Sequence, residues 1–175
     1  IDETKQVVGD ILARDPDLRR LSPEQQEKLF DAWWTHGDRE ELVTALVSHP
    51  RWLNAGWLFL AQSYADQKDF KDAWGIVARC APAPDIPAVS SDRSIEELQN
   101  AFSEQTDNLT IGILLYLAQS NRGDLNSALA TLRLLEKSST CPKYVYYLEA
   151  KLWAQQQQWE LAWTAWWNYH ATWRT

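Results

Sequence analysis

The chain has 175 residues, of which 45% are hydrophobic, so it is long enough and apolar enough to bury a sizeable core in one domain. Its formal net charge is −7 and it carries no basic patch, which argues against nucleic acid and anionic membrane surfaces as partners. No apolar run approaches the roughly 20 residues of a membrane-spanning helix, so these residues are not expected to insert directly into a membrane.

The first expected element is an amphipathic helix over residues 2–13, which together with a linker makes up an N-terminal segment, residues 1–21. Its apolar side chains recur at helical spacing on one side: Val7, Val8, Ile11 and Leu12. The next helix is expected to begin after Ser22. A capping serine, a proline at the first helical position and a glutamine three residues after the cap are typical of helix starts.

Four short polar stretches then divide the helical segments into pairs. They are THGD (35–38), DQKD (66–69), NRGD (121–124) and QQQQ (155–158), and each lies between two apolar segments of helical length. Three of them end in aspartate, whose carboxylate accepts hydrogen bonds from the free N–H groups of a helix start. Each stretch is therefore predicted to be a tight turn inside a helical hairpin.

The second hairpin carries the most distinctive pattern, which begins in WLFLAQSY. The residues at the key spacings are Trp57, Leu60, Ala61 and Tyr64, then Ala73 and Val77, and finally Pro82 and Pro84. This arrangement resembles the tetratricopeptide repeat (TPR), whose signature is W-x2-L-G-x2-Y…A-x3-F…P over about 34 residues. The resemblance implies that Ala61 and Ala73 lie where two helices cross closely.

The remaining hairpins match the pattern less fully. Ala128 and Ala162, which are 34 residues apart, take the position of Ala73, whereas Leu42 replaces it in the first hairpin and Glu149 stands where a leucine is expected. The resemblance implies an all-α fold: a right-handed array of about four TPR-like helical hairpins in a single domain, residues 1–175. An irregular helical bundle is the alternative. The hairpins are expected over residues 22–50, 51–80, 109–140 and 141–175.

An insertion, residues 81–108, separates the second hairpin from the third. Its first part, APAPDIPAVSSD (81–92), is predicted to be a loop, because prolines lack an N–H donor and hold the chain extended. Ser94 and Glu97 then have the spacing of a capping box, which predicts a short helix over about residues 94–105.

No stretch of the sequence indicates catalysis. Cys80 and Cys141 lack metal-ligand spacing, and free thiols are favoured over a disulfide between them. The three histidines have no ligand pattern, and there is no nucleophile elbow, phosphate-binding loop or dinucleotide-binding motif. We therefore predict no catalytic residue, metal or cofactor, and do not expect the chain to be an enzyme.

The resemblance also implies a binding surface, because TPR arrays bind partners on the concave face lined by the first helix of each pair. The residues expected there are Glu27, Asp31, Trp34, Leu58, Gln62, Ile113, Leu117, Tyr144, Tyr147 and Lys151. This groove is apolar with an acidic end, which suits an amphipathic helix that carries basic residues. The alternative is that the insertion or the N-terminal helix fills the groove.

The C-terminal segment from Trp159 to Trp173 holds five of the chain's 11 tryptophans and is apolar on nearly all sides of a helix. If Ala162, Trp166 and Tyr169 pack inward, three tryptophans face elsewhere: Trp163, Trp167 and Trp173. Exposed apolar patches of this kind usually mark an interface, so another protein chain, either a second copy or a different protein, is expected to cover them. The alternative is that these rings fold onto neighbouring hairpins.

Together these features favour a non-catalytic protein–protein interaction module, a scaffold or component of a larger complex. The rival interpretation is a soluble accessory domain of a membrane-bound glycan-processing or other enzyme whose chemistry lies outside this chain. The sequence does not indicate a compartment.

Overall fold

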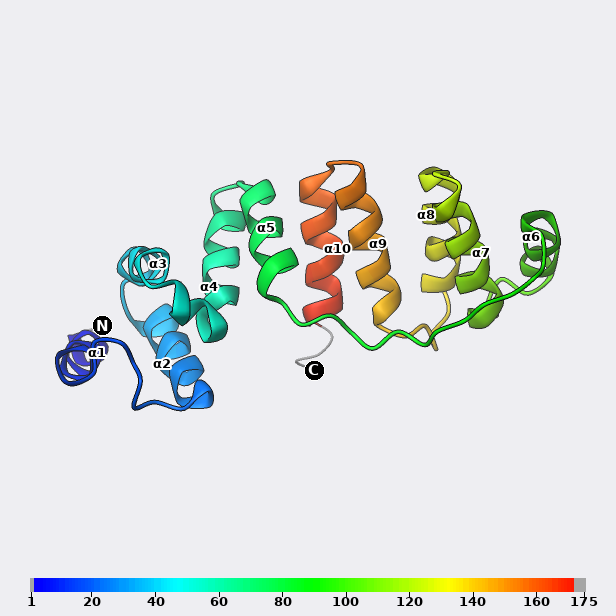
Figure 1. The fold of residues 1–175 in the computed structure, drawn as a ribbon. Coiled ribbons are helices and arrows are strands. Elements are labelled where there is room, and N and C mark those ends of the chain that lie inside the picture. The colour runs from blue at the N-terminus through cyan, green and yellow to red at the C-terminus, as the bar shows by residue number, and fades with distance from the viewer. Residues whose placement is uncertain (1, 172–175) are drawn as a thin grey trace. The chain divides into compact units, whose positions relative to one another are not determined.

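The computed structural model describes residues 2–171, and every regular element in that range is a helix (Figure 1). The predicted all-α class is confirmed. The chain divides into two compact units, Ile1–Pro82 and Ala83–Thr175. The division falls at the start of the proline-rich loop, since residues 83–94 carry no helix that would continue the packing of one hairpin onto the next.

The first unit is built around one central helix. Its elements are α1 (Asp2–Arg14), α2 (Pro23–His36), α3 (Arg39–Ser48), the 3₁₀ helix η1 (Pro50–Trp52), α4 (Leu53–Asp66) and α5 (Phe70–Cys80). Helix α4 packs against α2, α3 and α5. Gly56 allows this close approach, because a Cβ atom added there would lie 2.5 Å from Leu46 Cδ2 and 3.1 Å from Phe30 Cδ2.

The helix starts are those that the caps predict. The Ser22 side chain accepts a hydrogen bond from the Gln25 N–H at 3.2 Å, and the Gln25 side chain accepts one from the Ser22 N–H at 2.9 Å, which completes the capping box. The carboxylates of Asp38, Asp69 and Asp124 likewise cap α3, α5 and α8 (Leu125–Glu136). Each cap satisfies backbone N–H groups that the first helical turn leaves free.

Three of the four predicted turns share one backbone conformation. Lys68, Gly123 and Gln157 each adopt a positive φ, of 63°, 77° and 56°, at the second residue after a helix. In each turn the following N–H donates to the carbonyl five residues back: Asp69 to Tyr64, Asp124 to Gln119, and Gln158 to Trp153. This is the Schellman arrangement, in which a left-handed residue ends a helix and redirects the chain.

The predicted close crossing of α4 and α5 supports a test by mutation. Ala61 and Ala73 are both completely buried on these two packed helices. Leucine at position 73 would overpack the crossing, so Ala73→Leu should lower the free energy of unfolding by about 1–3 kcal/mol. Urea denaturation measures the loss. Ala78→Leu, at an exposed position of the same helix, is the control; an equal shift in both variants would contradict the crossing.

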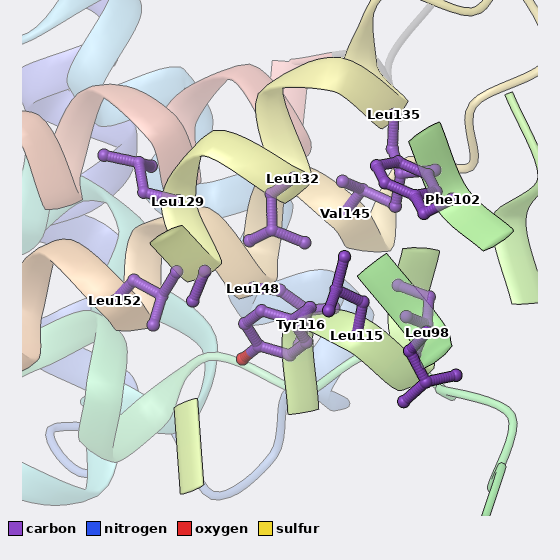
Figure 2. Packing of buried hydrophobic residues seen from close by; sticks show 12 residues of the cluster. Leu98, Phe102, Leu115, Tyr116, Leu129, Leu132, Leu135, Val145, Leu148 and Leu152 are labelled. Atoms are coloured by element: carbon purple, nitrogen blue, oxygen red, sulfur yellow. The ribbon is translucent and has the colours of Figure 1, made fainter. Parts of the chain in front are cut away.

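The second unit begins with the short helix of the insertion. Its helices are α6 (Ile95–Glu104), α7 (Leu109–Asn121), α8, α9 (Tyr144–Gln155) and α10 (Trp159–Ala171), and each packs on the next. The core of α6 to α9 is leucine-rich, and Leu98 and Phe102 of α6 belong to it (Figure 2). Gly112 lets α7 approach α8, because a Cβ atom there would lie 2.6 Å from Leu135 Cδ2.

Candidate interaction surfaces

The residues predicted to line a concave groove fall into two sets of five, one in each unit. In the first unit Glu27 and Asp31 are exposed and Gln62 is half-buried, whereas Leu58 is only 8% exposed and belongs to the core. Trp34 is half-buried, with its ring 5.7 Å from that of Phe59 and the Arg39 guanidinium 4.3 Å above it. Leu58 was therefore wrongly placed on a binding surface, because it faces the packed side of α4.

In the second unit the same correction applies to Ile113, which is 4% exposed and part of the core around Leu115 and Leu132. Leu117 and Lys151 are exposed, and Tyr144 and Tyr147 are half-buried. The Tyr147 ring contacts that of Tyr169 at 5.7 Å, and the Lys151 ammonium lies 5.8 Å from the Tyr147 ring.

The C-terminal tryptophans also depart from the prediction. Trp163 is only 8% exposed, so the expectation that it faces outward is wrong. The physical reason is ring stacking along α10: the Trp163 ring lies 5.5 Å from Trp166 and 5.7 Å from Trp167, and the Trp166 ring lies 5.0 Å from that of His170. Trp167 is half-buried, and Trp173 lies outside the described residues.

A groove that the sequence did not indicate runs over α4 in the first unit; we call it the α4 groove. It has a volume of about 610 Å³ and is lined by Val47, Pro50, Leu53, Asn54, Leu60, Tyr64, Ile76, Arg79 and Cys80. The lining comes from α3, η1, α4 and α5. Binding sites for small molecules and peptide side chains commonly have volumes of 300–1,000 Å³ and mostly apolar walls.

Val47, on the rim of the α4 groove, is 57% exposed, the largest exposed fraction among the large apolar side chains that the structure describes. On an adjacent part of the first unit, Trp34 and Arg39 line a smaller hollow of about 420 Å³. The prediction missed the α4 groove because first helices supply only part of its lining. Val47 and Arg79 lie instead on α3 and α5, the second helices.

The remaining chemistry of the described residues is sparse. Among residues 2–171 no group of three or more histidine, cysteine, aspartate or glutamate side chains is placed to hold a metal ion. No helix within that range has the length and apolar character needed to cross a membrane. The thiols of Cys80 and Cys141 are both free.

Comparison with known proteins adds no relative. No family model, curated protein or solved structure matches the chain.

Proposed function

We propose that this chain is a non-catalytic, TPR-like interaction module that binds a segment of another protein in the α4 groove. The observation that carries the proposal is a groove with both apolar and polar lining residues and with Val47 exposed on its rim. Burying an exposed valine against a partner removes apolar surface from water, which is the main favourable term in most protein associations.

The lining of the groove indicates the chemistry of the partner segment. Arg79 is the one charged side chain among the lining residues that the structure describes, and the walls are otherwise apolar or neutral. An apolar segment with an acidic side chain beside Arg79 would complement both features. This differs from the basic helix expected for the concave groove, because Glu27 and Asp31 do not line the α4 groove.

A scaffold needs more than one contact surface, and α10 offers a second. Leu161 is 42% exposed and Trp167 is half-buried on this helix, so both remain available for contact with another chain. A module with a peptide groove on one unit and accessible apolar side chains on a helix of the other suits a component of a larger assembly.

Selection of peptides from a random library displayed on phage tests the α4 groove. We expect enrichment of apolar peptides that contain aspartate or glutamate. Val47→Asp places a charge on the groove rim and should weaken binding of a selected peptide on the order of tenfold, measured by fluorescence anisotropy. Arg79→Glu should remove the preference for acidic peptides.

The matched control is Val7→Asp on α1. Val7 is 54% exposed, much like Val47, but does not line the groove. Binding should be unchanged in this variant, and circular dichroism should show that all variants remain helical. Equal weakening by Val7→Asp and Val47→Asp, or a selection that yields no binder sensitive to Val47→Asp, would contradict a peptide-binding role for the groove.

A further inference from the structure

Where α8 packs on α9, two carboxyl groups lie near one guanidinium group. Arg133 on α8 binds Glu149 on α9, with 3.2 Å between Nε and Oε1, and its guanidinium also lies 5.6 Å from the Trp153 ring. Glu149 is only 8% exposed, an unusual place for a carboxylate without such a partner. Glu136 lies one helical turn after Arg133 on the same helix.

Glu136 is half-buried, and its Oε1 atom is buried with no hydrogen-bond partner among residues 2–171. The pKa of Glu136 is raised from 4.5 to about 7, mainly by burial and then by repulsion from Glu149, while Arg133 acts in the opposite direction. A neutral Glu136 needs no cation. An ionised Glu136 would be a second carboxylate next to a guanidinium that already pairs with Glu149.

Two polar groups that interact with Glu136, Cys141 and Tyr146, carry no positive charge that would relieve this repulsion. The Cys141 thiol, in the loop after α8, and the Tyr146 hydroxyl of α9 both have raised pKa values. Burial is the larger cause for each, and repulsion from Glu136 is the next largest. Both side chains are therefore neutral near pH 7. Helix α7, which also packs on α8, carries no charged side chain, and Lys137 and Lys143 in the loop are exposed.

We propose that the Arg133, Glu136 and Glu149 cluster makes the packing of α8 on α9 pH-sensitive, with the two helices tightly packed at acidic pH and loosened above neutrality. The sign follows from linkage. A carboxyl group that binds its proton more tightly in the folded than in the unfolded chain stabilises the fold. This stabilisation is fully present at pH values below the pKa of the group in the unfolded chain, which is 4.5 for Glu136. That stabilisation is lost as the pH rises from 4.5 through about 7.

Thermal unfolding of the full chain between pH 5 and 8.5, followed by circular dichroism, tests the proposal. We expect the midpoint of the parent chain to fall across this range on the order of 4–8 °C. Glu136→Gln, whose amide stays neutral, should flatten the dependence between pH 5 and 8. Glu104→Gln, at an exposed glutamate of α6 in the same unit, should retain the full fall.

Two further measurements locate the effect. Hydrogen exchange should show protection of residues 136–149 decreasing at alkaline pH in the parent chain but not in Glu136→Gln, compared at equal pH so that intrinsic exchange rates cancel. If Glu136→Gln fails to fold, a carboxyl-carbon NMR titration of the parent chain decides the matter directly. A Glu136 midpoint below pH 5, or the same fall in midpoint for both glutamine variants, would overturn the proposal.

Discussion

Replacing Trp166 by alanine should lower the free energy of unfolding by about 3–5 kcal/mol, the usual cost of removing a buried tryptophan from a core. Trp166 is 1% exposed, and its ring contacts those of Trp163 and His170 on successive turns of α10. Truncation leaves a cavity that the rigid stack cannot close, because neighbouring rings have few alternative positions. Urea denaturation monitored by circular dichroism measures the loss.

Trp167→Ala is the matched control on the same helix. Trp167 is half-buried, so the apolar area lost is smaller and the expected cost is about 1–2 kcal/mol. Trp163 is 8% exposed, so replacing it by a polar residue should lower the free energy of unfolding by an amount closer to that of Trp166→Ala than to that of Trp167→Ala. Comparable losses from Trp166→Ala and Trp167→Ala would show that burial does not distinguish the two rings.

The second large effect is expected at the ion pair between α8 and α9. Arg133→Gln leaves the buried carboxylate of Glu149 without its cation, which should lower the free energy of unfolding by about 2–4 kcal/mol at pH 7. The Arg133 side chain is 57% exposed, which keeps the cost toward the lower end of that range because solvent screens the pair. Loss of the contact with Trp153 contributes to the same change.

A double variant separates the effect of the unpaired charge from that of lost side-chain packing. Glu149→Leu combined with Arg133→Gln should recover most of the stability, since it removes the unpaired carboxylate and places leucine where the repeat pattern expects one. A double variant no more stable than Arg133→Gln would mean that the guanidinium matters for packing alone.

The helices could be predicted because their signals are local. Ser22 and the aspartates at 38, 69 and 124 cap helices, and the polar stretches between helices form turns, as the sequence indicates. The division after Pro82 could not be predicted in this way. It depends on which distant hairpins share a core, and repeat spacing carries no information on that packing.

The candidate surfaces were harder to predict than the helices, for an identifiable physical reason. A helix such as α7, with the sequence LTIGILLYLAQSN, is apolar on nearly all sides, so its pattern does not reveal which face is buried. Ile113 and Leu117 both suit a core or a surface, and only the packing of the neighbouring helices decides that Ile113 is inside. The burial of Trp163 likewise depends on rings one turn along the helix.

The Schellman turns at Lys68, Gly123 and Gln157 give three helix pairs the same kind of connection between their first and second helices. Because the three turns share hydrogen bonds and a left-handed residue, the exit of one helix and the entry of the next follow the same local geometry whatever the side chains nearby. Only one turn uses glycine, the residue that adopts this conformation without strain. Because these turns lie inside helix pairs, the second helix of one pair can be exchanged for that of another, in evolution or by design, without a new turn having to be devised.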